Sequence, residues 1–276
     1  MADLIPCDLH VHPDYSIDAF STIDEYCRQA TEIGLQILGF TTHYDINPKR
    51  LDLDAFMVVD GQTVGADDYA LNRYCEDVIA ARNSYPELKI LLGLEIEYFH
   101  GIEEEAAQLR RQFPFDYFIG SVHCLDDIAI SDSKEGKQYF AAHTIDQMTN
   151  NYFELLYECA NCGMFDVIGH ADYYWRFAVP YFGEKVFEIY KGRLEKIAHA
   201  ATRSKCGFEI NTSQMRKGKD FHPRLDFLQE LVNHGGVVNS IGSDSHKAEH
   251  LGADINTALA SLAHNNIPFQ PFYDRK

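Results

Sequence analysis

The chain has 276 residues, of which 46% are hydrophobic, and its formal net charge is −18 at pH 7. This size is ordinary for one α/β barrel with a large core, so we expect a single domain over residues 1–276. The negative charge, without a basic stripe, disfavours a nucleic-acid partner. No run approaches the roughly 20 apolar residues that a membrane span needs.

The first residues and the cysteine pattern predict the cellular compartment of the protein. The first residues enter a predicted strand almost at once and lack the basic and apolar regions of a signal peptide, which indicates a cytoplasmic protein. The seven cysteines are scattered and odd in number, which argues against a disulfide framework. Cys159 and Cys162 form a CxxC pair inside a predicted helix, with no second pair nearby. We therefore interpret them as helix-face cysteines rather than a redox or zinc site.

Predicted strands and helices alternate along the chain, which is the pattern of βαβ units in a parallel sheet. In the first half, strands and helices alternate in this order, beginning with a strand: 5–11, 22–34, 36–41, 67–84, 89–95, 103–113 and 116–122. Thr22 and Glu25 are spaced as a capping box at the start of the first helix. The polar segment 44–66 has no regular pattern, so we predict a loop or lid there.

The second half continues the alternation, beginning with a helix: 145–162, 166–170, 184–203, 207–211, 223–235, 237–244 and 254–264. A second loop is predicted at 126–138, on the same face as the first. We expect the elements to form a closed barrel of seven or eight parallel strands surrounded by helices. The competing arrangement is an open, doubly wound sheet.

Seven short apolar runs end in side chains that can bind a divalent metal. In chain order the ends are His10 with His12, His43, Glu95, His123, His170, Asn211, and Asp244 with His246. Only Asn211 is a poor ligand. Such side chains at one edge of successive parallel strands are typical of a catalytic site at the mouth of a barrel. A flat sheet does not easily gather residues from seven strands, so the pattern favours the barrel and predicts a metal-dependent hydrolase.

The donor types narrow the choice of metal. His10 and His12 are two residues apart on a strand, so both imidazoles face the same side. Imidazole mixed with carboxylate suits Zn²⁺, Mn²⁺ or Fe²⁺ better than Mg²⁺ or Ca²⁺. Glu95 lies deeper than Glu97 on the same strand face and is the better bridging ligand. We expect Glu97 to orient it or to face solvent.

Ordered motifs over roughly residues 5–252 resemble those of the polymerase-and-histidinol-phosphatase (PHP) superfamily, and its monofunctional histidinol-phosphatase branch above all. The motifs are DLHVHPDYSIDA, TTHYD, GLEIEYF, GSVHCLDD, DVIGHADYYWRF, FEINTSQMRKG and IGSDSH. The resemblance implies a distorted (β/α)7 TIM-like barrel of the PHP type. It also implies a centre of two or three divalent metal ions (Zn²⁺, Mn²⁺ or Fe²⁺).

Carried over motif by motif, the resemblance implies nine metal ligands: His10, His12, Asp18, His43, Glu95, His123, His170, Asp244 and His246. Asp18 has no signal of its own, because an aspartate after a strand is usually a turn or cap residue. The HxHxxxSxD pattern of the family singles it out. Glu95, Asp244 and His246 are expected to act in catalysis as well.

The resemblance also divides the ligands among the ions. The first ion would take His10, His12, Glu95 and Asp244, the second Glu95, His123 and His170, and the third Asp18, His43 and His246. Arg176 and Arg216 follow strand ends, and in similar phosphatases arginines in these motifs grip the substrate phosphate. The planar guanidinium suits that task; a solvated loop arginine is the alternative for each.

The activity that the resemblance implies is hydrolysis of L-histidinol phosphate, a small phosphorylated substrate, in histidine biosynthesis. One alternative is a PHP-fold phosphoesterase acting on phosphotyrosine, a nucleotide or another phosphomonoester. A non-catalytic metal-binding regulatory module would have lost ligands, whereas all nine positions are filled. An amidohydrolase-like enzyme often uses a carboxylated lysine at a strand end, and no predicted strand here ends in lysine.

Two further expectations concern the rim of the site. Tyr44, Asp45, Tyr98 and Phe99 follow ligand positions and could form an acidic, aromatic rim for the cationic leaving group. Packing at the top of the barrel is the alternative for the aromatic residues. His250 follows the last ligand closely and is a candidate general acid.

Overall fold

The computed structural model describes residues 7–274. Seven parallel strands pair in the order β1 (Cys7–Val11), β2 (Ile37–Tyr44), β5 (Lys89–Glu97), β6 (Tyr117–Ser121), β9 (Val167–Ile168), β10 (Gly207–Asn211) and β11 (Val238–Gly242). Residues 5 and 6 of the predicted first strand lie outside the described residues. The remaining predicted strands are confirmed, each within a few residues of its predicted bounds.

The sheet curls until its first and last strands meet. Val11 forms a parallel bridge with Ser245, just beyond β11, and the backbone N–H of His12 donates to the carbonyl of Ser245 at 2.8 Å. The seven strands therefore form a nearly closed barrel, as predicted, and the open doubly wound sheet is excluded. Barrel closure brings all strand ends of one polarity to a single mouth.

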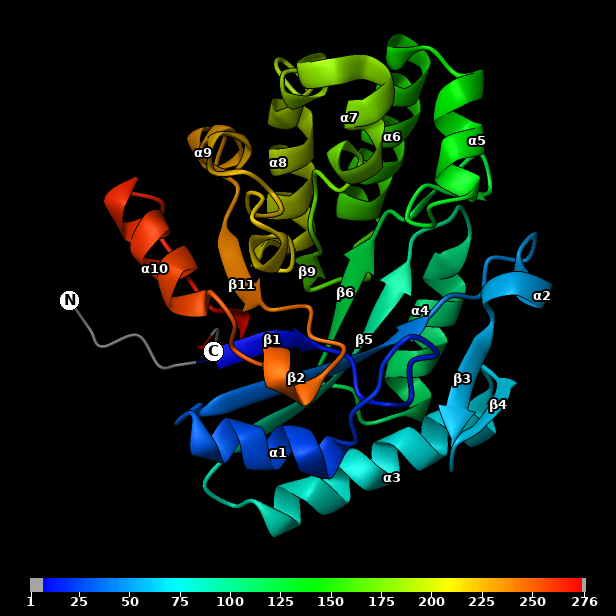
Figure 1. Cartoon of the computed structure of the whole chain (residues 1–276), viewed down its shortest axis with the longest axis vertical. Helices are drawn as coiled ribbons and strands as arrows, with labels where there is room; N and C mark the ends of the chain where they lie inside the picture. The colour runs from blue at the N-terminus through cyan, green and yellow to red at the C-terminus, as the bar shows by residue number, and fades with distance from the viewer. Residues whose placement is uncertain (1–6, 275–276) are drawn as a thin grey trace.

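Helices cover the outside of the barrel (Figure 1). They are α1 (Ile23–Glu32), α3 (Asp68–Ser84), α4 (Ile102–Gln112), α6 (Ile145–Asn161), α8 (Leu194–Ser204), α9 (Leu225–Asn233) and α10 (Ile255–His264). The capping box at α1 is confirmed, because the Thr22 backbone N–H donates to Glu25 Oε2 and the Thr22 hydroxyl accepts from the Glu25 N–H. Between residues 7 and 274, no helix is both long and apolar enough to cross a bilayer.

The prediction of an irregular loop at 44–66 is wrong. The segment contains a short helix, α2 (Leu51–Asp54), and a hairpin of β3 (Phe56–Val59) and β4 (Gln62–Gly65), seen at the right of Figure 1. Asp60 and Gly61 have φ angles of 50° and 74°. That is the left-handed backbone which a two-residue Asp-Gly hairpin turn requires. The sequence carried this signal between two short β-prone runs.

Two other segments also differ from prediction. The loop expected at 126–138 contains β8 (Ile128–Ala129), which pairs with β7 (Cys124–Leu125), and the start of α5 (Glu135–Ala142). The helix predicted at 184–203 begins only at Leu194, after α7 (Trp175–Phe182) and a 3₁₀ turn at Gly183–Phe187. Gly192 at φ 74° interrupts the helical geometry just before α8.

Tyr117 fills the lower part of the barrel interior. Its hydroxyl donates to the carbonyl of Leu9 at 2.8 Å. The ring lies against neighbouring strands where glycines leave space for it: a Cβ added at Gly93 would be 2.7 Å from the ring. The interior below the mouth is therefore packed with side chains, and the open space begins at the strand ends.

Candidate metal centre

Glu95, near the end of β5, occupies the middle of the mouth and is 1% exposed. Its Oε2 atom lies 3.1 Å from His43 Nδ1, 3.3 Å from His10 Nε2 and 3.4 Å from His12 Nε2. These three histidines come from β1 and β2 and from the residue that follows β1. Strand alternation explains the grouping, because residues two apart on a strand share one face.

The other oxygen of Glu95 faces a second group of histidines. Oε1 lies 2.8 Å from His170 Nε2 and 3.4 Å from His123 Nε2, and it accepts a hydrogen bond from the Ser121 hydroxyl at 2.6 Å. The two imidazole nitrogens are 3.4 Å apart. One buried carboxylate thus separates two groups of nitrogen donors, which is the geometry expected of a bridging ligand.

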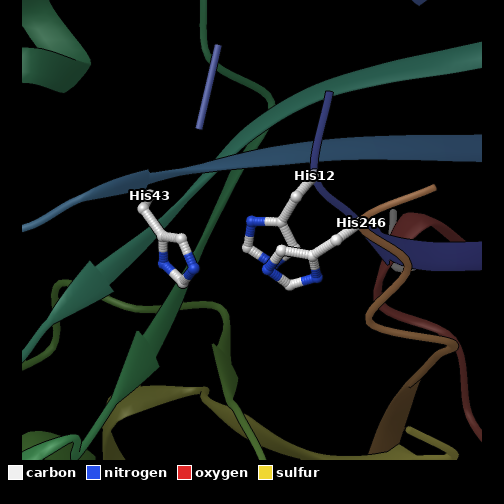
Figure 2. Close-up of side chains that lie close together, drawn as sticks. All are labelled: His12, His43 and His246. Carbon is white, nitrogen blue, oxygen red and sulfur yellow. The ribbon is translucent and has the colours of Figure 1, made fainter. Parts of the chain in front are cut away.

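A third group lies at the outer edge of the mouth (Figure 2), where His12, His43 and His246 point toward one another. The ring centroid of His12 is 4.3 Å from that of His43 and 4.2 Å from that of His246. Asp18 reaches this group from the loop after β1, with Oδ2 at 3.2 Å from His246 Nε2 and Oδ1 at 3.9 Å from His43 Nε2. The loop aspartate therefore lies beside the group that the family pattern predicted.

Asp244 completes the set from the segment after β11. Its Oδ1 atom lies 3.4 Å from His12 Nε2, 3.6 Å from His246 Nδ1 and 4.0 Å from His10 Nε2. Asp244 has a φ of 52° and His170 a φ of 21°, both unusual for residues other than glycine. Backbone strain of this kind is commonly stored at functional sites.

The crowding of charged groups shifts several pKa values. Burial, followed by the nearby His246 and His43, lowers the pKa of His12 to about 3. Burial also opposes protonation of His43, but Glu95 and Asp18 outweigh it and raise the pKa to about 9. The neutral His12 ring therefore has a lone pair available in the centre of the cluster.

The residues present fit a divalent metal centre. Four ring nitrogens in the cluster are buried without a hydrogen-bond partner: His10 Nε2, His12 Nε2, His43 Nδ1 and His170 Nδ1. Unpartnered buried polar atoms are costly unless a ligand satisfies them. Four overlapping triads have donor atoms within 4.8 Å of one another: His12/His43/His246, His10/His12/Glu95, His10/His170/Asp244 and Glu95/His123/His170. Mixed nitrogen and oxygen donors suit Zn²⁺, Mn²⁺ or Fe²⁺.

The two predicted phosphate-binding arginines occupy different places. Arg176 lines the cavity at the mouth, whose volume is about 600 Å³, and donates to the hydroxyl of Tyr173. Arg216 is not among the lining residues. Its guanidinium donates to the carbonyl oxygens of Ser243 at 2.6 Å and Asp244 at 3.2 Å. Arg216 therefore braces the segment that carries Asp244.

Most of the predicted rim lies elsewhere. Of the four residues proposed for it, only Asp45 lines the cavity, where burial raises its pKa to about 6. Tyr44 and Tyr98 are nearly buried and donate to glutamates of α4, while Phe99 lines a separate cavity. Strand alternation turns the Tyr44 ring away from the side of His43, and the hydrogen bonds to α4 give Tyr44 and Tyr98 packing roles. His250 is 39% exposed and does not line the metal cavity.

Two buried glutamates support the ligands. Glu97 was expected to orient Glu95 or to face solvent, but it is 3% exposed and instead accepts the backbone N–H groups of His123 at 2.8 Å and Cys124 at 2.9 Å, so it holds the His123 segment. Glu209 on β10 accepts from the ring of His10 at 2.7 Å and was missed in the sequence. A charged residue inside the apolar run GFEIN was the available signal.

A nearly closed α/β barrel with clustered imidazoles and carboxylates at its mouth has the architecture of a metal-dependent hydrolase. A family model described as the PHP domain matches residues 8–213, which is more than half of the chain. The chain therefore belongs to the PHP domain family.

Curated relatives cover nearly the whole chain. It is 25% identical over 261 residues to a probable histidinol-phosphatase of Clostridium acetobutylicum, which covers 94% of each sequence. It is 28% identical over 278 residues to a probable histidinol-phosphatase of Schizosaccharomyces pombe, covering 94% of this chain and 86% of the relative.

Solved structures show the same fold. Histidinol phosphate phosphatase of Lactococcus lactis has a TM-score of 0.79 at 22% identity, covering 96% of this chain and 95% of that one. A putative histidinol phosphatase of Listeria monocytogenes has a TM-score of 0.71 at 18% identity, covering 91% and 99%.

Proposed function

We propose that this protein is a cytoplasmic phosphomonoesterase of histidine biosynthesis, which hydrolyses L-histidinol phosphate to L-histidinol and phosphate. The observation that carries the proposal is the bridging position of Glu95 between two groups of histidines, in a cavity that also contains Arg176. The names of the relatives support the substrate. So does the Lactococcus lactis structure, which contains zinc, L-histidinol and phosphate.

The ligand assignment follows the clusters. His10, His12, Glu95 and Asp244 would hold one ion, Glu95, His123 and His170 a second, and Asp18, His43 and His246 a third. Bound divalent ions would supply acidified water and positive charge for the phosphate. We assign catalytic roles to Glu95, Asp244 and His246, because these side chains would adjoin the reacting phosphate.

Arg176 is the group best placed to bind the phosphate. It lines the cavity, and its planar fork of donors matches two phosphate oxygens. The Tyr173 hydroxyl and the rings of Tyr173 and Phe177 hold the guanidinium in place. Arg216, the second arginine proposed from the sequence, would have to leave two carbonyl oxygens to reach a phosphate. We therefore give it a role in holding the Asp244 segment.

Acidic residues in the lining of the cavity favour a cationic leaving group. They include Asp45, Asp54, Asp132 and Glu135. Arg50 is the basic residue among them and pairs with Asp54 at 2.5 Å and Glu135 at 2.7 Å. A net negative wall suits the ammonium group of histidinol phosphate and would repel the additional phosphates of a nucleotide.

A substrate panel tests the proposal. The metal-loaded protein should hydrolyse L-histidinol phosphate with a kcat/KM at least about 100-fold above that for phosphotyrosine, AMP or p-nitrophenyl phosphate, a difference of roughly 3 kcal/mol in transition-state binding. Similar values across the panel would retain a phosphoesterase but reject the specific substrate. Tight metal binding without hydrolysis of any member would favour the regulatory module.

A further inference from the structure

β10 is the strand whose end adds no member to the metal-binding triads, yet two of its side chains point at the ligands. Glu209 Oε1 lies 2.7 Å from His10 Nδ1, and both side chains are completely buried. Glu209 accepts N–H donors at its other oxygen, and as an acceptor at Oε1 it assigns the proton of this hydrogen bond to His10 Nδ1. The lone pair of His10 is then on Nε2, the nitrogen that faces Glu95.

We propose that Glu209 is a positioning residue of the metal centre. It fixes the tautomer and orientation of His10, and it holds His170 and Asp244 in their positions relative to His10. The inference rests on the proposed metal centre and assigns a role to a residue outside its ligand set. A carboxylate behind a metal-bound histidine is a recurrent device for raising the affinity of the site.

The second oxygen of Glu209 extends the same support to other strands. Oε2 accepts the backbone N–H of His170 at 3.0 Å and the side-chain amide of Asn211 at 3.2 Å. The same amide of Asn211 lies 3.3 Å from Asp244 Oδ2. The carboxylate of Glu209 thus connects His10 on β1 with His170 after β9. Through Asn211 it also reaches Asp244 after β11. Both oxygens already accept hydrogen bonds, and Glu209 belongs to none of the four triads.

Glycines on neighbouring elements leave the space that Glu209 and His10 occupy. A Cβ added at Gly242 would be 2.6 Å from Glu209 Oε1 and would collide with the Cβ of His10. A Cβ at Gly169 would be 2.7 Å from the Ser121 hydroxyl and 3.7 Å from Glu209 Oε2. Gly242 and Gly169 therefore stand where the Glu209 carboxylate and the His10 imidazole approach the neighbouring backbone.

The chain contains a matched control. Asp172 Oδ1 lies 2.7 Å from His222 Nδ1, at the same distance and in the same complete burial as the Glu209–His10 pair. His222 belongs to none of the four triads. Neutralising Asp172 therefore perturbs a buried carboxylate–imidazole pair without touching the ring of a proposed ligand.

The experiment compares Glu209→Gln with Asp172→Asn. Glutamine has one acceptor oxygen, so either His10 or the His170 N–H loses its acceptor. We expect the zinc affinity of Glu209→Gln, measured by competition with a chromophoric chelator, to fall by about 10- to 100-fold at one ion per chain. Asp172→Asn should keep the wild-type affinity. Equal losses in both variants, or an unchanged Glu209→Gln, would overturn the inference.

A second measurement needs no variant. In wild-type protein with ¹⁵N-labelled histidine, the His10 Nδ1 atom should carry a proton with and without zinc, while the Nε2 resonance moves when zinc binds. Loss of the Nδ1 proton on zinc addition would overturn the inference even if Glu209→Gln failed to fold. If the wild-type protein bound none of Zn²⁺, Mn²⁺ or Fe²⁺, the proposed function would fail first, so the two failures are distinguishable.

Discussion

Glu95 Oε1 lies 2.8 Å from His170 Nε2, although the two residues are 75 positions apart in the chain. The other oxygen of the same carboxylate contacts histidines of β1 and β2. One side chain on β5 therefore joins donors from both sides of the barrel.

Replacing Glu95 by glutamine should remove the proposed bridge while keeping the shape of the side chain. The variant would retain one acceptor oxygen and lose the negative charge that both groups of histidines share. We expect kcat for L-histidinol phosphate to fall by about 100-fold or more, with loss of at least one bound metal ion per chain. Steady-state kinetics and elemental analysis of the same sample check this. Full activity with full metal content would contradict the bridging role.

Removing the metal should affect both activity and stability. Dialysis against a chelator is expected to abolish hydrolysis, and addition of Zn²⁺ or Mn²⁺ should restore it. Because the metal binds only the folded chain, saturation at 1,000 times Kd should stabilise it by about 4 kcal/mol per ion. Thermal melts with and without metal measure the change. A chelator-stripped sample that hydrolyses the substrate at the original rate would refute metal dependence.

Substitution of Arg176 and of Arg216 should have different effects on the measured properties of the enzyme. Arg176→Ala removes the cavity-facing guanidinium and should raise KM for the phosphate substrate by about 10- to 100-fold, since charge-assisted hydrogen bonds contribute about 1.5 to 3 kcal/mol. Arg176→Lys keeps the charge but loses the fork, so only part of the effect should return. Arg216→Ala should instead lower metal content and Tm. Equal KM effects in both alanine variants would show that Arg216 contacts the substrate.

The acidic wall predicts a pH dependence of stability. The hydrogen bond from Arg50 holds the pKa of Glu135 below its ordinary value. The pair therefore stabilises the fold fully above the unfolded pKa of about 4.3, and this contribution disappears as the pH falls through the folded pKa. The difference in unfolding free energy between wild type and Glu135→Gln should be on the order of 1 kcal/mol near pH 7 and approach zero in acid.

Urea denaturation of metal-free protein between pH 3 and 7 measures this difference. The exposed Glu104 on α4 provides the control, because Glu104→Gln removes a carboxylate that projects into solvent. Its difference from wild type should stay small and nearly constant with pH. If the difference in unfolding free energy between wild type and Glu135→Gln grew as the pH fell, the Arg50–Glu135 pair would not be its source.

The barrel interior predicts a packing effect. Gly93→Ala places a methyl group 2.7 Å from the Tyr117 ring and should lower the free energy of unfolding by about 1 to 3 kcal/mol. Gly65→Ala on the β3–β4 hairpin is the control, because the nearest atom there is 4.0 Å away. Chemical denaturation should show a near-neutral effect at Gly65. Equal costs at both positions would indicate a backbone effect rather than contact with Tyr117.

Much of the fold was accessible from local patterns. Alternating strands and helices predicted the barrel, and the capping box at Thr22 and Glu25 was confirmed. The Asp-Gly turn of the β3–β4 hairpin is visible in the sequence, but the polar residues around it indicate a loop. Gly192 was also visible, but the apolar spacing on both sides of it suggested one continuous helix.

The sequence by itself determined which residue types stand at the strand ends. The apolar runs end at His10, His43, Glu95 and His170, each of which can bind a metal. Only the tertiary structure decided which atoms meet. It turned Tyr44 and Tyr98 into packing residues, tied Arg216 to backbone carbonyls and placed Glu209 behind His10. The physical reason is that the direction of a side chain and its partner depend on strand register and barrel closure, which join residues far apart in the chain.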